Sequence, residues 1–283
     1  MAVLAVAFDF DDTLVPDSTT KLLKSRGVDP VRFWQTDVPA RITQGWDPTL
    51  AWLAELLENV QPGRPLEGLT NAQLREFGAT LDADFYQGLP GLFDDLRTEV
   101  SKYRDLSIEF YIVSGGLKDV IDGSRTVQLY FAATYGSLLA EDPKTRAVGF
   151  IKRAVTFTEK TRFLFEIHKG IEPAETIKNP YLVNQDVPKE KRRIPFGNMV
   201  YIGDGLTDIP CFSLLKQAGG IPFGVFDPTK QDSAKRAFRE FLKTGRVVNI
   251  NTPRYGPDDD LGVVLRAVVA ARATELSARR AEA

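Results

Sequence analysis

Cysteine and histidine are scarce in this sequence, and neither sign of charge is in excess. A single cysteine, Cys211, among 283 residues excludes an internal disulfide framework and is typical of a reducing compartment. The single histidine, His168, falls late in a predicted helix, where a surface or helix-end role is the default, so we assign it no catalytic part. With 36 basic and 38 acidic residues and no basic stripe, the chain lacks the electrostatic footprint of a nucleic-acid binder.

Long hydrophobic runs are also missing. The N-terminal segment MAVLAVA is apolar but short, has no basic start and leads into acidic residues, so we do not expect a signal peptide. No stretch approaches the roughly 20 apolar residues that a membrane-spanning helix needs. Together with the cysteine count, these absences predict a cytoplasmic protein without a membrane partner. They leave the oligomeric state open.

Five short, β-rich apolar runs are present instead. Each is almost continuously apolar, which is typical of strands covered on both faces, and helical patterns separate most of them. This alternation predicts an α/β fold with a doubly wound parallel sheet, that is, a Rossmann-like core. The predicted strands are residues 3–10, 108–113, 199–202, 221–226 and 247–250.

Residues 16–88 do not follow this alternation. They contain no convincing strand, and the stretch LAWLAELLENV within them has a helical pattern. The stretch GLPG at 88–91 marks the return to the main domain. We therefore predict an α/β core formed by residues 1–15 and 89–283, interrupted by a helical insertion formed by residues 16–88. Residues 141–149 and 184–193 are predicted surface loops, and residues 266–283 a helix that ends in a charged tail.

Polar residues stand where three of the predicted strands end. Asp9 and Asp11 end the first, Ser114 ends the second, and Asp204 ends the third, with Asp208 four residues later. Ligands of parallel sheets bind beyond the carboxyl ends of the strands, so these side chains are expected to meet in one crevice. Mg²⁺ prefers oxygen ligands and often bridges to a substrate phosphate, which predicts a magnesium site there.

This set of residue types suits phosphoryl transfer. One of the carboxylates of Asp9 and Asp11 can attack phosphorus while the other donates a proton to the leaving oxygen. Ser114 can donate a hydrogen bond to a phosphoryl oxygen, and Gly115 and Gly116 after it allow a backbone N–H to approach closely. A lysine is then expected to balance the charge of the transferring group.

The stretches DFDDT, IVSGG and GDGLTD resemble, in this order, the first, second and fourth motifs of the haloacid dehalogenase (HAD) superfamily of phosphohydrolases. The motifs extend from residue 9 to residue 208, so the resemblance covers nearly the whole chain. It implies a HAD-type core with a helical cap between the first and second motifs, as in the phosphoserine-phosphatase-like branch. Such a cap closes over the site and restricts access to small phosphorylated molecules.

The resemblance also implies roles for the acidic residues. Asp9 would be the nucleophile that becomes an aspartyl-phosphate, and Asp11 the general acid that later acts as a base on water. Asp204 would bind Mg²⁺ together with Asp9 and the backbone carbonyl of Asp11. Asp208 completes the predicted metal group by orienting the waters of the ion.

The remaining implied roles concern the phosphoryl group. Ser114 would bind a phosphoryl oxygen, with Gly115 and Gly116 in the same phosphate-binding segment. Thr13 would support the first loop within that part of the site. The third motif is a lysine near a helix start, for which Lys160 in FTEKTRFLFEI fits best. Weaker alternatives are Lys118, Lys152 and Lys169.

These residues predict a Mg²⁺-dependent phosphatase that hydrolyses a small phosphorylated metabolite. Phosphoserine enzymes of the family carry a glutamate shortly after the first motif to hold the substrate amine, whereas this chain has VPDSTTK, where Asp17 could stand in. Two alternatives remain open, namely a phosphotransferase or mutase of the same fold and a phosphate-binding regulatory module without turnover. The sequence identifies neither the substrate nor the pathway.

Overall fold

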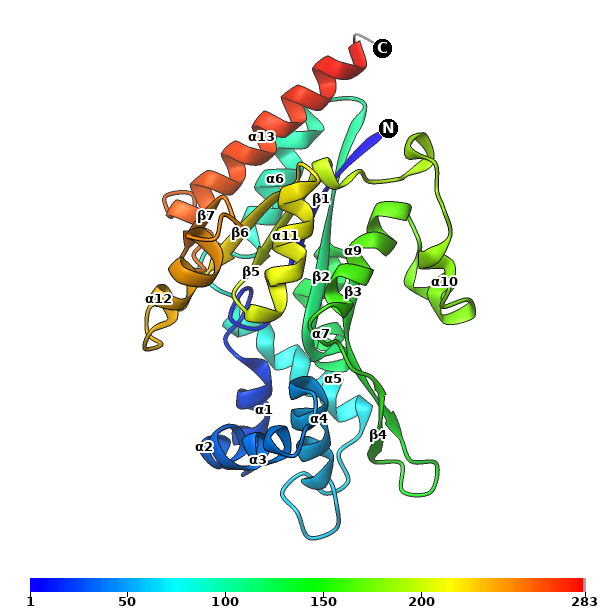
Figure 1. Cartoon of the computed structure of the whole chain (residues 1–283), viewed down its shortest axis with the longest axis vertical. Helices are drawn as coiled ribbons and strands as arrows, with labels where there is room; N and C mark the ends of the chain where they lie inside the picture. The colour runs from blue at the N-terminus through cyan, green and yellow to red at the C-terminus, as the bar shows by residue number, and fades with distance from the viewer. Residues whose placement is uncertain (282–283) are drawn as a thin grey trace.

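The computed structural model describes residues 1–281, which form a seven-stranded sheet with helices on both faces (Figure 1). The strand order is β4-β3-β2-β1-β5-β6-β7, and all neighbouring strands are parallel except β3 and β4. This arrangement confirms the predicted doubly wound α/β core. The strands are β1 (Ala2–Phe8), β2 (Leu106–Leu117), β3 (Phe131–Glu141), β4 (Val148–Arg153), β5 (Met199–Gly203), β6 (Ile221–Val225) and β7 (Asn249–Asn251).

Alternate side chains of the central strands enter two separate apolar clusters. On one face Leu4, Val6 and Phe8 of β1 lie in the cluster that includes the apolar residues of α6 (Gly91–Ser101) and α13 (Asp260–Ala281). On the other face β1 packs with α9 (Glu159–Lys169) and α11 (Ile209–Gln217). Burial on both faces explains why the strand sequences are almost continuously apolar.

All five predicted strands are present, but β3 and β4 were missed. The first half of β3 reads FAATYGS, and its small residues give a weak strand signal. β4 is an edge strand whose exposed positions break the apolar pattern. The predicted loop 141–149 is the turn of this antiparallel hairpin, although Glu141 already belongs to β3 and Val148 to β4.

The segment 16–88 is helical and contains no strand, as its pattern predicts. Figure 1 places α1 to α4 beyond the carboxyl ends of the central strands, with the β3–β4 hairpin beside α4. The hairpin contacts this segment directly, because Val148 N donates to the carbonyl of Leu69 at 2.7 Å. The helices are α1 (Ser18–Ser25), α2 (Pro30–Arg32), α3 (Val38–Thr43), α4 (Pro48–Glu58) and α5 (Asn71–Thr80).

The last helix of this segment is packed tightly on the core. α5 lies against α7 (Lys118–Gly123), which follows β2. A Cβ atom at Gly78 of α5 would lie 2.0 Å from the carbonyl oxygen of Val120, and one at Gly123 would lie 2.1 Å from that of Arg75. Two glycines therefore allow the backbones of α5 and α7 to touch, and fix the segment 16–88 to the core next to β2.

Three smaller features complete the fold. Residues 184–193 form a mostly exposed loop, as predicted, which includes the short turn Lys189–Lys191. α13 continues to Ala281, and the end of the predicted charged tail, 282–283, lies outside the described residues. Within residues 1–281, no helix combines the length and the apolar character needed to cross a membrane.

Candidate active site

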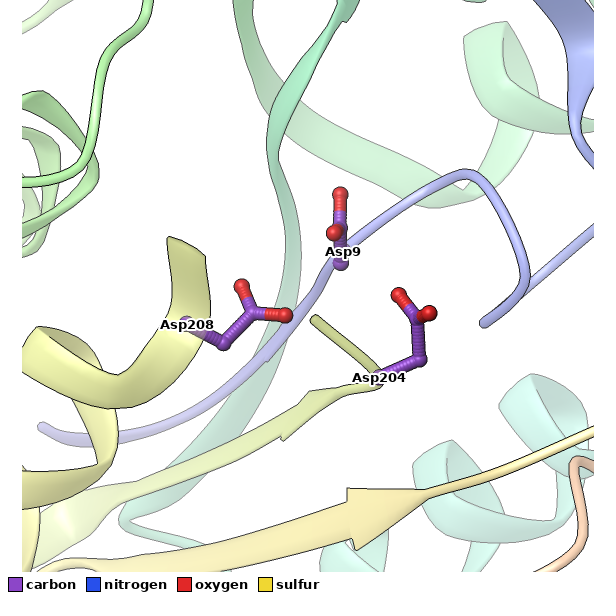
Figure 2. A group of neighbouring side chains, drawn as sticks. All are labelled: Asp9, Asp204 and Asp208. Carbon is purple, nitrogen blue, oxygen red and sulfur yellow. The ribbon is translucent and has the colours of Figure 1, made fainter. Parts of the chain in front are cut away.

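The predicted site residues meet at the carboxyl edge of the sheet. Asp9 follows β1 directly, Asp204 follows β5, and Asp208 ends the short turn Leu206–Asp208. Figure 2 shows the three carboxylates turned toward a common space, and one oxygen of each lies within 4.8 Å of the others. Asp9 and Asp204 border a cleft of about 220 Å³, and Asp208 is buried behind them. The cleft is lined by Asp9, Asp11, Asp12, Asp17, Thr19, Trp34, Trp52, Ser114, Gly115, Gly116, Asp204 and Thr207.

The loop after β1 places two acids on the cleft. Asp9 N still donates to the carbonyl of Ile202 on β5 at 2.8 Å, so Asp9 continues the strand geometry. The chain then turns through Asp12, whose φ of +54° lies in the left-handed region that asparagine and aspartate tolerate. Asp11 Oδ1 accepts from the backbone N–H of Ser18 at 2.7 Å. Asp11 is therefore held by the first helix of the segment 16–88.

A buried lysine joins two of the acids. Lys160 is the second residue of α9, and its side chain is fully buried. Its Nζ lies 2.7 Å from Asp9 Oδ2 and 2.6 Å from Asp208 Oδ1. The alternatives do not reach the cleft. Lys118 bonds to Asp122, Lys169 to the carbonyls of Val183 and Gln185, and Lys152 is exposed on β4.

Asp208 is fixed by three donors. Besides Lys160, the hydroxyl of Tyr201 donates to Asp208 Oδ1 at 2.6 Å, and the N–H of Gly205 donates to Oδ2 at 2.9 Å. Sequence reasoning missed Tyr201, because inside the apolar strand MVYIG it is indistinguishable from a core residue. We call Asp9, Lys160, Tyr201 and Asp208 the floor of the cleft, since all four are buried.

Burial shapes the electrostatics of the acids. It raises the pKa of Asp9, against the opposing effect of Lys160, and raises the pKa of Asp11 to about 8, with a further contribution from the charge of Asp17. It also raises the pKa of Asp204 well above its usual value, with the charge of Asp9 next in weight. The cleft thus concentrates negative charge that Lys160 balances only in part.

The donor set fits a hard divalent cation. Asp9, Asp204 and Asp208 offer only carboxylate oxygens, which are the ligands that Mg²⁺ prefers. No group among residues 1–281 donates a hydrogen bond to the carboxylate of Asp204, although this group borders the cleft beside Asp9. A cation there would both pair Asp204 and relieve the repulsion that raises these pKa values.

Three of the predicted phosphate-binding residues, Ser114, Gly115 and Gly116, lie near the end of β2. Ser114 lines the cleft, and its Oγ accepts from Gly116 N at 3.1 Å. A Cβ atom at Gly116 would lie 2.7 Å from Asp11 Oδ2, whereas one at Gly115 would meet nothing closer than 3.8 Å. Thr13 is fully buried beneath the first loop and does not line the cleft. Its position favours the supporting role over direct contact with phosphate.

Two other contributions to the cleft lie outside the predicted site residues. Asp12 lines the cleft and pairs with Lys230 from the loop after β6. The opposite side of the cleft consists of Asp17, Thr19, Trp34 and Trp52, all from the segment 16–88, and we call these four residues the wall. Of these four residues, only Asp17 was singled out from the sequence, as a possible replacement for the amine-binding glutamate.

Comparison with known proteins places this site in a recognised fold. No family model matches the sequence. An uncharacterized protein of Borreliella burgdorferi is 31% identical over 235 residues, which cover 75% of this chain and 78% of that protein. A substrate-bound phosphoserine phosphatase superimposes with a TM-score of 0.56 at 15% identity, over 94% of this chain and 99% of that one.

A HAD family hydrolase from Salmonella enterica subsp. enterica serovar Typhi gives a TM-score of 0.54 at 14% identity, over 88% of this chain and 67% of that one. At these identities the structural matches establish the fold. The chain therefore belongs to one family with the Borreliella burgdorferi protein, and its fold is that of the HAD superfamily of hydrolases.

Proposed function

We propose that this protein is a Mg²⁺-dependent phosphomonoesterase that hydrolyses a small phosphorylated metabolite through an aspartyl-phosphate. One observation carries the proposal: the buried Lys160 ammonium binds Asp9 at the floor of a cleft that Asp11 and Ser114 also line. A carboxylate held by a lysine, beside a second carboxylate and a hydroxyl, is the set that covalent phosphoryl transfer requires. The phosphatase fold of the structural relatives supports the same reaction.

The first half-reaction transfers the phosphoryl group to Asp9. Lys160 at Oδ2 and the N–H of Phe10 at Oδ1 fix the Asp9 carboxylate. An oxygen of Asp9 attacks phosphorus, the bond from phosphorus to the substrate oxygen breaks, and Asp11 donates its proton to the leaving alcohol. Burial of Asp11 raises its pKa to about 8, so it holds this proton at neutral pH.

The second half-reaction returns the enzyme to its starting state. Asp11, now ionised, accepts a proton from water, the water oxygen attacks phosphorus, and the bond from phosphorus to Asp9 breaks to release phosphate. Ser114 and Lys160 stay beside the phosphoryl oxygens in both steps. When bound by Asp9, Asp204 and the carbonyl of Asp11, with Asp208 nearby, Mg²⁺ would supply positive charge that offsets the phosphoryl oxygens.

The surroundings of the site support a small soluble substrate. A cleft of about 220 Å³ holds a phosphate ester of a few carbon atoms rather than a polymer. The sole cysteine, Cys211, is buried and unpaired, which supports the cytoplasmic location that we propose. We propose no nucleic-acid or membrane partner.

The test is Mg²⁺-dependent hydrolysis of an aryl phosphate by the purified protein. We expect turnover that disappears with EDTA and in Asp9→Asn, but persists in the surface variant Asp258→Asn, because Asp258 is exposed and far in sequence from the motifs. Activity that survives in Asp9→Asn would overturn the assignment of the nucleophile. Transfer to an added alcohol in preference to water would identify a phosphotransferase instead, and a failure to process any small phosphate ester would favour a regulatory module.

A further inference from the structure

The strand β2 leaves its regular pairing at residues 114–116, the predicted phosphate-binding segment. β2 and β3 are paired at Val113 and again at Leu117, but the three residues between them lie opposite a single residue of β3. Such a bulge leaves backbone groups without their partners in the sheet. Because the segment lines the cleft, its backbone groups have to be held in place by contacts from outside the ladder.

Ser137 of β3 supplies one of these contacts. Its side chain is fully buried, and its hydroxyl donates to the carbonyl of Gly115 at 2.8 Å. The carbonyl of Gly115 and the N–H of Gly116 belong to one planar trans peptide group, so they point in opposite directions. The N–H of Gly116 in turn donates to Ser114 Oγ at 3.1 Å. One peptide group therefore connects the hydroxyl of Ser137 with that of Ser114.

This peptide group has little support of its own. It is flanked by two glycines, whose backbones have the widest range of conformations, so it can rotate unless its polar ends are held. Rotation would withdraw the N–H of Gly116 from Ser114 Oγ. With that bond in place, the Ser114 oxygen is occupied as an acceptor and its own proton is free to be donated into the cleft. The bond from Ser137 thus helps to orient the Ser114 hydroxyl.

The same side chain also contacts the chain that leads to Lys160. Ser137 Oγ accepts from the N–H of Val155 at 3.1 Å, and Val155 lies in the link 154–158 between β4 and α9. The carbonyl of Val155 accepts from Thr49 Oγ1 of α4 at 3.4 Å, which brings the segment 16–88 to the same point. Ser137 therefore uses its donor on the phosphate-binding segment and its acceptor on the link to α9.

We propose that Ser137 is a positioning residue for phosphate binding, which holds residues 114–116 and the link to Lys160 at a fixed separation. It acts through other residues, because it is fully buried and does not line the cleft. This inference rests on the proposed function, in which Ser114 and Lys160 contact phosphoryl oxygens. Alanine at position 137 keeps nearly the size of serine but loses both hydrogen bonds.

A second buried serine is the matched control. Ser124 is as buried as Ser137, and its hydroxyl also donates one hydrogen bond, to Asp82 Oδ1, and accepts one, from the N–H of Val127. It caps α8 (Arg125–Tyr130) and does not line the cleft. The free energy of unfolding should therefore fall by a similar amount in Ser137→Ala and Ser124→Ala, as urea unfolding can verify.

The probe is inorganic phosphate, titrated calorimetrically in the presence of Mg²⁺. Ser137→Ala should raise the Kd for phosphate about tenfold over wild type, whereas Ser124→Ala should stay within about twofold. The kcat/KM for an aryl phosphate should fall by a similar factor in Ser137→Ala alone. A purely structural role of Ser137 would not separate two variants of equal stability. Thr49→Val should raise the Kd in the same direction but less, because the bond that it removes is longer.

The outcomes separate this inference from the proposed function. Equal Kd and kcat/KM values in Ser137→Ala and Ser124→Ala would overturn the inference, and the phosphatase would stand if both variants hydrolyse the ester. Weaker phosphate binding in Ser137→Ala, in a protein whose wild type hydrolyses no ester, would retain the positioning role and overturn the phosphatase. A wild-type protein that neither binds phosphate nor hydrolyses an ester would overturn both.

Discussion

The floor and the wall of the cleft differ in how firmly their polar groups are held. In the floor, Asp9, Lys160, Asp208 and Tyr201 are joined by contacts of 2.6 to 2.7 Å, and all are buried. In the wall, the polar bonds of Asp17 stay within its own helix start, and its ring neighbours are only partly buried. A rigid charged network serves a reaction with fixed geometry, whereas a looser aromatic surface serves the recognition of one class of molecule.

The largest effect is expected when the floor loses its only cation. Lys160→Met leaves Asp9 and Asp208 buried without their shared partner, so the free energy of unfolding should fall by about 3–5 kcal/mol. Hydrolysis should become undetectable in the same variant. Urea unfolding and an aryl phosphate assay measure the two effects. Lys152→Met is the control, since Lys152 is exposed, and a Lys160→Met protein as stable as this control would contradict the network.

The next effect tests the close contact between Asp11 and Gly116 of the predicted phosphate-binding segment. In Gly116→Ala the new methyl group would stand 2.7 Å from Asp11 Oδ2, and displacing this carboxylate should lower kcat/KM by about 100-fold. In Gly115→Ala the nearest atom is 3.8 Å away, an ordinary contact, so the loss should be clearly smaller. Steady-state kinetics of the two variants test this difference. An equal loss of kcat/KM in both would show that Asp11 does not occupy the position described.

A smaller effect is expected when the floor loses one neutral donor. Tyr201→Phe removes a hydrogen bond to Asp208 Oδ1 but leaves Lys160 in place, so the stability should fall by about 1–3 kcal/mol. The apparent affinity for Mg²⁺ in the hydrolysis assay should fall as well, because Asp208 is less firmly oriented. Tyr103→Phe removes an exposed hydroxyl from its contact with Thr274 and should change neither quantity.

The smallest effect concerns the attachment of the segment that carries the wall. Asp82 accepts from Ser124 Oγ at 2.6 Å and from the N–H groups of Arg125 and Thr126. Burial alone would raise the pKa of Asp82, but these hydrogen bonds lower it below its unfolded value. Its contribution to stability is therefore complete above the unfolded pKa of about 3.9 and is lost as the pH falls through the folded value.

The check is a series of unfolding experiments at decreasing pH. Wild-type protein should lose more stability than Asp82→Asn as the pH falls below about 4, because asparagine has no proton to gain. Identical pH profiles for the two proteins would show that Asp82 does not hold the segment 16–88 to α8 (Arg125–Tyr130) through its charge.

The contrast between the floor and the wall also explains which site residues could be predicted from the sequence. Asp9, Ser114 and Asp204 each end an apolar run, so strand topology alone brings them to one edge of the sheet. The identification of Lys160 depended on the family resemblance, because a lysine at the start of a helix is ordinarily exposed. Tyr201 could not be recognised as part of the site. A buried tyrosine in a strand gives the same sequence pattern whether it only packs in the core or also donates a hydrogen bond to a site residue.

The wall and its neighbours depend on contacts between distant parts of the chain. Lys230 meets Asp12 across 218 positions of sequence, and no local pattern encodes such a pair. Trp34 and Trp52 reach the cleft only because the helices that carry them lie beyond the strand ends. The β3–β4 hairpin was missed for a related reason, because an edge strand that packs on helices beyond the sheet lacks the pattern of a central strand.

The most direct test of the central claim is to find the phosphoryl group on the enzyme. Protein mixed with Mg²⁺ and an aryl phosphate is quenched in acid, digested and analysed by mass spectrometry. Asp11→Asn should accumulate the label, because an aryl leaving group needs no acid but the release step needs a base. The account predicts one added phosphoryl group on the peptide that contains Asp9, and none in Asp9→Asn. A label on Ser114, or phosphate release with no labelled enzyme at any time, would contradict it.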